Sequence, residues 1–260
     1  MLTKRWWRCV MAVASLGICG AASAAPDGGV SLIAADAGVF CTLDERNPTA
    51  PGNGMVCDLL RELSRRVGHP QSPKPYPLQR AMMVAATGPG IVMAPLTRTP
   101  LRERNYQWLV RLFDEDFVVV AKRGSNVDIS TLDKVGRLRV GVVREGVSAE
   151  HIKNHGWQGL QLATRDVANA RKLDRGRIDA WVGPWNGILS TQRAAGLRTE
   201  DLRRGVLLKR TGVYLVGSPD LDPAIGGAWK KAFDDMIRDG SYGRVLHQYG
   251  FVSPPPSTVP

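Results

Sequence analysis

Two kinds of apolar pattern alternate along the chain. The segment 58–68, DLLRELSRRVG, places three leucines and Val67 on one helical face, between Asp58 at its start and Gly68 at its end. This spacing predicts a helix, whereas a short continuous apolar run such as 30–36, VSLIAAD, is typical of a buried strand. The same patterns predict further strands at 90–96, 116–122, 138–143, 178–183 and 213–217, and further helices at 78–86, 167–176, 224–240 and 242–250.

Short strands that alternate with helices predict an α/β fold with parallel sheets covered on both faces. Sheets of this kind bind ligands at the carboxyl ends of their strands. The segment PLTRTPLRER, 95–104, lies at such a strand end and brings Arg98, Arg102 and Arg104 close together. This strand end is therefore a candidate site for an anion.

The first 24 residues have the three-part pattern of an export signal. Basic residues precede the apolar run 9–19, and the small residues Ala22-Ser23-Ala24 end the segment. We therefore predict a signal peptide over 1–24, cleavage after Ala24 and a periplasmic location. The alternative is a lipoprotein signal that ends at Cys19, but Ile18 stands where such signals favour a small residue.

Charge narrows the range of partners. The formal net charge is +11, and the part that remains after the signal peptide leaves favours anionic partners such as acidic ligands or phospholipid surfaces. A solvated basic surface that keeps the protein soluble explains the same charge. We expect no nucleic-acid partner for an exported protein. The proline-rich end at 254–260 predicts a disordered tail.

Cys41 and Cys57 are the two cysteines that remain once the signal peptide is removed. A single cysteine pair in an exported protein favours a disulfide, and the alternative is two buried free thiols. His151 and His155 have the i, i+4 spacing of a metal-binding pair on a helix, but neither an HExxH motif nor a third nearby ligand accompanies them. We therefore predict no metal site and no cofactor.

Five segments, taken in order, carry a family pattern. GNGMVCDLLRELSRRVG has a Gly-x-x-x-Asp start of a helix, and TRTPLRERNYQWLVRLFDEDFVVVAKR has a Thr-x-Thr-x-x-Arg segment followed by a strand. GRLRVGVVREGVSAE, DRGRIDAWVG and AWKKAFDDMIRDGSYGRVLHQYG follow. Together these segments span nearly the whole mature chain and resemble the periplasmic solute-binding proteins of polar amino-acid ABC transporters, the family 3 type.

The resemblance implies two α/β lobes that close like a hinge on a small solute. Two strands would cross between the lobes, near 117–122 and 213–217. The first lobe would then be discontinuous, with residues 25–118 and 217–253, and the second lobe would comprise 119–216.

Thr97, Thr99 and Arg102 match the family's Thr-x-Thr-x-x-Arg segment, in which the arginine binds the α-carboxylate of the ligand. The chemistry agrees, because a planar guanidinium can hold a carboxylate through two parallel hydrogen bonds. The alternative for Arg102 is a structural ion pair with Glu103 or another carboxylate of the protein. We expect Arg98 and Arg104 to be solvated surface charges.

Other ligand-binding residues follow from weaker matches. The resemblance places Asp36 as a polar contact and Phe40 and Tyr76 as aromatic walls, although aromatic residues of sheet proteins more often belong to the core. Arg144 and Ser148 follow the strand predicted at 138–143, where a helix start favours anions.

One departure from the family concerns the ligand's ammonium group. Members that carry ordinary amino acids usually have an acidic residue where this chain has Pro184, after the DAWV stretch. Without that acid a buried ammonium would lack its partner. Either Asp36 replaces the acid, or the solute is not a standard α-amino acid. An organic acid, or an acid with an apolar body that Trp181 or Trp185 covers, fits these residues better.

We therefore predict a monomeric, non-enzymatic protein that captures a small carboxylate-bearing solute, amino-acid-like or an organic acid, for an ABC permease in the inner membrane. Some relatives of this fold instead act as accessory or sensor partners. Others are cyclohexadienyl dehydratases that use a carboxylic acid in the cleft, for which Glu145 is the nearest candidate. An acid in a basic loop is ionised, however, and is a poor proton donor.

Overall fold

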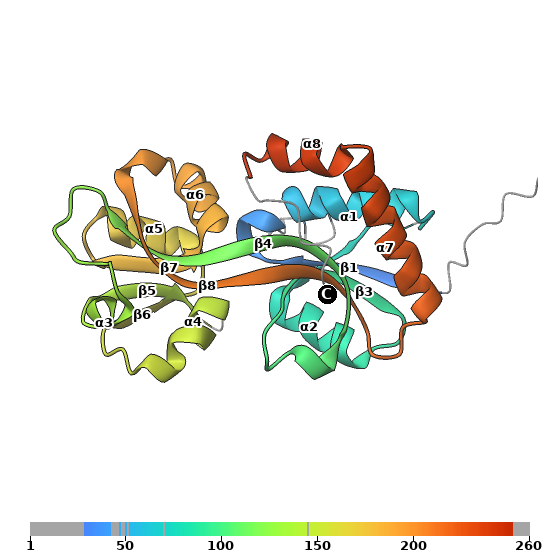
Figure 1. Cartoon of the computed structure of the whole chain (residues 1–260), viewed down its shortest axis with the longest axis horizontal. Coiled ribbons are helices and arrows are strands. Elements are labelled where there is room, and N and C mark those ends of the chain that lie inside the picture. Colours follow the sequence, from blue (N-terminus) through green and yellow to red (C-terminus); the bar gives the residue numbers. More distant parts are fainter. Residues whose placement is uncertain are drawn as a thin grey trace, which may run out of the picture.

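The computed structural model describes residues 29–251, apart from 43–46, 48–49, 51, 70 and 145. The predicted signal peptide and the predicted tail lie outside the described residues. One eight-stranded sheet has the order β2-β1-β3-β8-β4-β7-β5-β6. Helices cover both faces of the sheet in two groups, one at each end, so that two lobes are joined by β4 and β8 (Figure 1). The predicted two-lobed α/β fold is confirmed.

The first lobe contains three parallel strands at one end of the sheet. β1 (Ser31–Asp36) lies between β2 (Lys74–Pro77) and β3 (Ile91–Thr97). The carboxyl ends of these strands therefore meet at one edge of the sheet, as is usual for the binding edge of parallel sheets. The other elements of this lobe are η1 (Gly38–Phe40), α1 (Met55–Arg66), α2 (Leu78–Thr87), η2 (Glu103–Asn105), α7 (Pro223–Arg238) and α8 (Ser241–Gln248).

The second lobe repeats this plan at the other end of the sheet. β5 (Val140–Val143) lies between β7 (Ala180–Pro184) and β6 (Leu160–Ala163) and is parallel to both. The other elements are α3 (Leu132–Val135), α4 (Val147–Ile152), η3 (Lys153–His155), α5 (Asp166–Asp174), α6 (Trp185–Ala194) and η4 (Thr199–Asp201).

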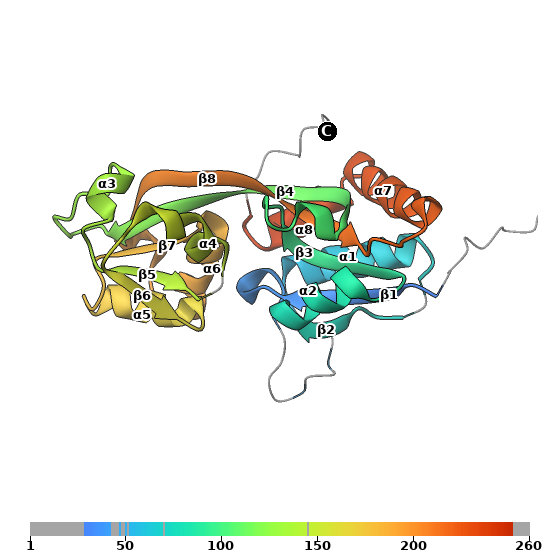
Figure 2. The ribbon, with the colours of Figure 1, turned by 90° about the horizontal axis from the view of Figure 1, so that it is seen from below.

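Two long strands connect the lobes. β4 (Gln107–Lys122) and β8 (Leu202–Gly217) are antiparallel partners along their whole length. β8 also pairs with β3 of the first lobe, and β4 pairs with β7 of the second lobe. Figure 2 shows the two strands running side by side along one side of the molecule, with β1 and β2 of the first lobe and β5 and β6 of the second lobe below them in that view.

Successive side chains of each strand enter different hydrophobic cores, because side chains of a strand alternate between its two faces. In β1, Leu32 and Ala34 pack with residues of α1, α7 and α8, whereas Ile33 and Ala35 pack with residues of α2. The valine run 118–120 of β4 is divided in the same way between the two cores of the second lobe. Strands buried on both faces explain why the sequence shows continuous apolar runs here.

The predicted strands and helices are all present, and several differences have clear reasons. β4 and β8 begin earlier than the strands predicted at 116–122 and 213–217. The sequence pattern missed the added parts because charged residues interrupt their apolar runs. β2 and β6 were not predicted, and they are the two edge strands of the sheet. β2 has the sequence KPYP, and proline is tolerated at an edge because it has no backbone N–H to donate. α6 was not predicted either.

The predicted lobe boundary at 118/119 falls within β4, and the boundary at 216/217 falls at the end of β8. These boundaries stay a prediction. In the part of the chain that the structure describes, no helix has the length and apolar character needed to cross a membrane.

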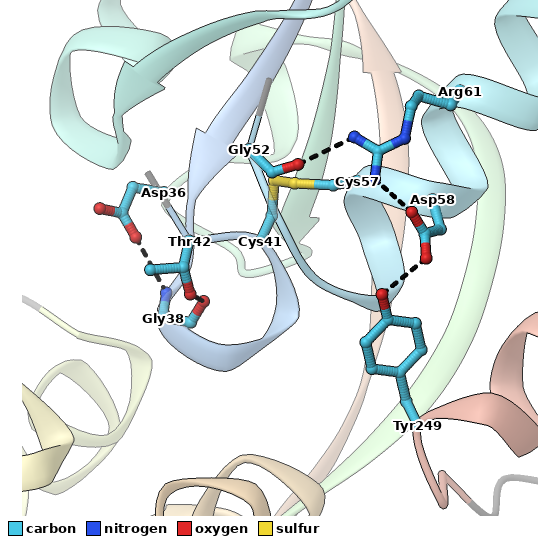
Figure 3. The surroundings of a disulfide bond; sticks show 9 residues. All are labelled: Asp36, Gly38, Cys41, Thr42, Gly52, Cys57, Asp58, Arg61 and Tyr249. Carbon is cyan, nitrogen blue, oxygen red and sulfur yellow. Dashed lines mark hydrogen bonds and ion pairs between the residues drawn. A yellow bond between two sulfur atoms is a disulfide. The ribbon is translucent and has the colours of Figure 1, made fainter. Parts of the chain in front are cut away.

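A disulfide joins Cys41, just after η1, to Cys57 in the first turn of α1 (Figure 3). The predicted disulfide is therefore present in the structure. Next to it, Arg61 donates a hydrogen bond of 2.8 Å to the carbonyl oxygen of Gly52 and forms an ion pair with Asp58. The Tyr249 hydroxyl donates to the other oxygen of Asp58 at 2.6 Å. These contacts fasten the segment after β1 to α1 and to the end of α8.

We predict that the mature protein, denatured without reductant, contains no free thiol. Reduction should lower the free energy of unfolding by about 3 kcal/mol, because the bond closes a loop of medium length in the unfolded chain. Thiol titration and urea denaturation with and without dithiothreitol measure both effects. Two titratable thiols per chain, or identical urea midpoints, would contradict the prediction.

Candidate functional site

The loop after β3 turns the Arg102 side chain into the molecule. The backbone N–H of Arg102 donates to the carbonyl oxygen of Thr99 at 3.0 Å, which closes a turn directly before η2. Arg102 is only 7% exposed, although it carries a full charge. Its Nη1 donates a hydrogen bond of 3.3 Å to the carbonyl oxygen of Thr97. The turn thus holds a guanidinium in a buried position at the carboxyl end of β3.

A carboxylate of the second lobe faces this guanidinium. Glu150 lies in α4, and its Oε2 is 3.7 Å from Nη2 of Arg102. Burial lowers the pKa of Arg102, and the Glu150 carboxylate acts in the opposite direction. Among the described residues, the Arg102 side chain therefore has one hydrogen bond to a carbonyl oxygen and one long ion pair, although a guanidinium has five N–H donors.

Further polar groups lie close to this ion pair. The Thr99 hydroxyl is buried and has no hydrogen-bond partner among the described residues. The same holds for Nε2 of His151, which follows Glu150 in α4. Burial lowers the pKa of His151, and the positive charges of Lys209 and Arg102 act in the same direction, whereas the Glu150 carboxylate opposes them; the balance favours the neutral imidazole. Ser148 is also buried, in the first turn of α4.

The remaining predicted residues have other surroundings. Asp36, at the end of β1, accepts a hydrogen bond of 3.2 Å from the backbone N–H of Gly38 (Figure 3). Tyr76, near the end of β2, lies under the Arg80 guanidinium, which is 4.8 Å from the ring centre. Arg144 is exposed after β5.

Two predicted aromatic residues lie where the lobes approach each other. The ring of Phe40, in η1, packs against Phe113 and Phe251 at centroid distances of 5.6 and 6.2 Å. A small pocket beside Phe40 is lined by residues of both lobes: Phe40, Met55 and Phe251 of the first lobe, and Asn186, Leu189 and Arg193 of α6. Arg102 does not line this pocket. Trp185, the first residue of α6, has the Arg204 guanidinium at 5.2 Å from its ring centre.

Arg98 is exposed, as expected, and its Nε donates a hydrogen bond of 2.9 Å to the exposed Glu103, while its guanidinium lies over the rings of Trp108 and Tyr214. One expectation about a side chain near the site was wrong. Trp181 is 0% exposed and packs in a core of the second lobe, so it is not available to cover a solute.

Arg104 is exposed, as predicted. Glu145, the nearest candidate for the proton-donating acid of a dehydratase, lies outside the described residues. His151 and His155 fall in different helices, α4 and η3, so they do not share the single helical face that an i, i+4 metal-binding pair needs. No cluster of three or more potential metal ligands occurs among the described residues.

One charged residue of the region between the lobes was missed by sequence reasoning. Glu115, on β4, is 1% exposed and accepts a hydrogen bond of 3.1 Å from the backbone N–H of Asn186. Its carboxylate thus caps the first turn of α6. Burial raises the pKa of Glu115 from 4.5 to about 7, although the hydrogen bonds from Asn186 favour the charged form. In the sequence, DED at 114–116 looks like an ordinary solvated charge run.

Comparisons with known proteins agree with the fold. A scan against family models and a search of curated proteins find no match. Among solved structures, a histidine kinase sensor domain with similarity to periplasmic binding proteins has a TM-score of 0.73 and 15% identity, over 86% of this chain and 98% of that one. The probable amino-acid ABC transporter extracellular-binding protein from Bacillus subtilis has a TM-score of 0.67 and 16% identity, over 85% and 97%.

A third similar structure is an ancestral amino acid-binding protein described as a precursor of cyclohexadienyl dehydratase. Its TM-score is 0.67 at 15% identity, over 85% of this chain and 95% of that one. At such identities the likeness shows the fold: the chain has the two-lobed fold of periplasmic binding proteins, and its structural neighbours include amino-acid-binding proteins of ABC transporters.

The buried Glu115 carboxyl generates a pH-dependent prediction. The pKa of Glu115 is about 7 in the folded protein and 4.5 for an ordinary glutamate, so between these pH values the folded state binds more protons than the unfolded state. The free energy of unfolding therefore falls as pH rises through this interval. Glu115→Gln keeps an oxygen that can accept from Asn186 and cannot ionise. Relative to wild type, the variant should therefore gain on the order of 2–3 kcal/mol in unfolding free energy between about pH 5 and pH 8.

Urea denaturation of both proteins at the two pH values measures this difference. Asp166, whose pKa burial raises to about 6, and His151 are common to both proteins, so their contributions cancel. A difference between the two proteins that does not change with pH would show that Glu115 does not titrate in this range.

Proposed function

We propose that this protein is an exported solute-binding protein that captures a small carboxylate-bearing solute between its two lobes. The observation that carries the proposal is the buried Arg102 guanidinium at the carboxyl end of β3. Its contacts with Thr97 and Glu150, at 3.3 and 3.7 Å, do not satisfy a desolvated cation. A buried charge without a close partner costs free energy, and an incoming anion removes that cost.

A carboxylate suits Arg102 better than other anions of similar charge, because its two oxygens match the planar fork of a guanidinium. The hydroxyl of Thr99 and Nε2 of His151, which have no hydrogen-bond partner in the described part of the chain, add two groups that can hydrogen-bond to the solute. We propose that Thr97, Thr99 and Ser148 lie around the bound carboxylate with Arg102.

We assign outer positions of the site to the remaining predicted residues. Phe40 and Trp185 come from different lobes and would bound the solute at the edge near α6. Asp36 and Tyr76 stand at neighbouring strand ends of the first lobe, and Arg144 stands after β5 of the second lobe. Because these residues belong to both lobes, we expect the solute to favour the closed arrangement.

We propose uptake as the purpose of this binding. The protein would act as a monomer in the periplasm, after removal of residues 1–24, and would deliver its solute to an ABC permease of the inner membrane. The structural likeness to a probable amino-acid ABC transporter extracellular-binding protein supports this setting. We propose binding without catalysis, since Glu115, an acid whose pKa burial raises to about 7, is 1% exposed and accepts a hydrogen bond from the backbone of Asn186.

A sensor role is the second candidate. It is favoured by the likeness to a histidine kinase sensor domain, with a TM-score of 0.73. In that role the same site would bind the same kind of solute, and closure of the lobes would be read by a partner protein. The assignment of Arg102 is common to both candidates.

Replacement of Arg102 tests the proposal. Arg102→Ala should weaken binding of a carboxylate solute by about 2–5 kcal/mol, because the buried anion would lose its partner. A thermal-shift screen of the standard L-amino acids and of short organic acids would identify a solute, and calorimetric titration would then compare the proteins. The variant should remain folded, since the side chain it loses is a poorly paired buried charge.

Arg104→Ala is the matched control, because Arg104 lies two residues away in the same segment and is exposed. It should change the affinity by less than about 1 kcal/mol. Arg98 does not serve as a control, since it pairs with Glu103. An Arg102→Ala variant that binds as tightly as wild type would refute the proposed anchor.

A further inference from the structure

We infer that Glu150 determines the class of solute: it binds a cationic group, so that the site selects a zwitterion over a simple carboxylic acid. The inference rests on the proposed function, in which Arg102 binds the carboxylate of the solute. It names a partner for the ammonium group of the solute, which Pro184 cannot bind because proline has no acidic side chain.

The geometry leaves both charged groups able to bind a solute. A charge-assisted N–H···O bond spans about 2.7–2.9 Å. The 3.7 Å between Nη2 of Arg102 and Oε2 of Glu150 is an ion-pair distance and not a hydrogen bond. Arg102 therefore keeps N–H groups for a carboxylate, and Glu150 keeps oxygens for an ammonium. In an α-amino acid the carboxylate and the ammonium group are attached to the same carbon. Their proposed partners, Arg102 and Glu150, are likewise neighbours.

Charge balance favours the same class of solute. Arg102 is 7% exposed, and the side chain of Glu150 is 24% exposed, so both charges are largely removed from water. Together they are neutral. A monoanion bound to Arg102 would leave one uncompensated negative charge beside Glu150, whereas a zwitterion leaves none.

The other acids near the lobe interface are engaged elsewhere. Glu115 is 1% exposed and bonded to Asn186 at the start of α6. Asp36 accepts a hydrogen bond from the backbone of Gly38. Asp116 is paired with Arg204 and Arg210 of β8. Among the described residues, Glu150 is the carboxylate that forms an ion pair with Arg102.

The experiment compares matched pairs of solutes in four proteins. Standard L-amino acids and their 2-hydroxy counterparts, which lack the ammonium group, are screened by thermal shift at pH 7. The pairs that bind are then titrated by calorimetry into wild type, Glu150→Gln, Arg102→Ala and the control Glu200→Gln, which changes an exposed acid of η4.

Wild type and Glu200→Gln should bind the amino acid about 10- to 100-fold more tightly than its hydroxy counterpart, because only the amino acid pairs with Glu150. In Glu150→Gln this preference should fall to about threefold or less, chiefly through weaker binding of the amino acid. The affinity for the hydroxy acid should stay the same or rise, since the repulsion by Glu150 is removed.

Several outcomes would overturn the inference. One is a wild-type protein that binds both compounds with equal affinity or binds no amino acid. A second is a preference for the amino acid over its hydroxy counterpart that survives in Glu150→Gln. Another is an equal gain in affinity for both compounds in Glu150→Gln, which would show that Glu150 merely competes for Arg102. If Arg102→Ala abolishes binding while the preference is unaffected by Glu150→Gln, this inference fails and the proposed function stands. If Arg102→Ala has no effect, the proposed function fails.

Discussion

The antiparallel pairing of β4 with β8 is the constraint on which the rest of the structure depends. It runs from Gln107 opposite Gly217 to Lys122 opposite Leu202 and makes one sheet of the two lobes. Each lobe adds its parallel strands to one of these two partners, so the position of every binding loop is fixed relative to this pair. The register of the pair is irregular in two parts of β4, 108–113 and 117–120. Any closing motion must be accommodated by these two strands.

Charged residues concentrate where the pair crosses from one lobe to the other. On β4, Asp116 joins Arg204 and Arg210 of β8, and Glu115 points instead to the start of α6. Both acids make contacts at the connection between the lobes: Asp116 links the crossing strands to each other, and Glu115 links β4 to a helix of the second lobe. Arg102 differs from these residues, because its ion pair with Glu150 is long and its remaining N–H groups are available. This contrast separates the charges that hold the structure together from the charge proposed to bind the solute.

The sequence predicted the framework better than the site. Apolar runs such as 30–36 and 90–96 identified strands that are buried on both faces, and their order indicated the two-lobed plan. The first half of β4, 107–115, and most of β8, 202–212, were not recognised as strand, because charged residues interrupt their apolar pattern. Arg102 was identified because it belongs to a motif at a strand end. Glu150 was not, since an acid in a short polar helix has no distinguishing pattern, and its role depends on how the second lobe faces the first.

The most direct measurement identifies the solute that Arg102 retains. The purified mature protein and the Arg102→Ala variant are each incubated with a small-molecule extract of cells, separated from unbound compounds by filtration, denatured and analysed by mass spectrometry. If Arg102 anchors the solute, wild type should enrich a compound that contains a carboxylate group, and the variant should not enrich it. Equal enrichment by both proteins, enrichment of a compound without a carboxylate, or no enrichment by wild type would contradict the assignment of the site between the lobes.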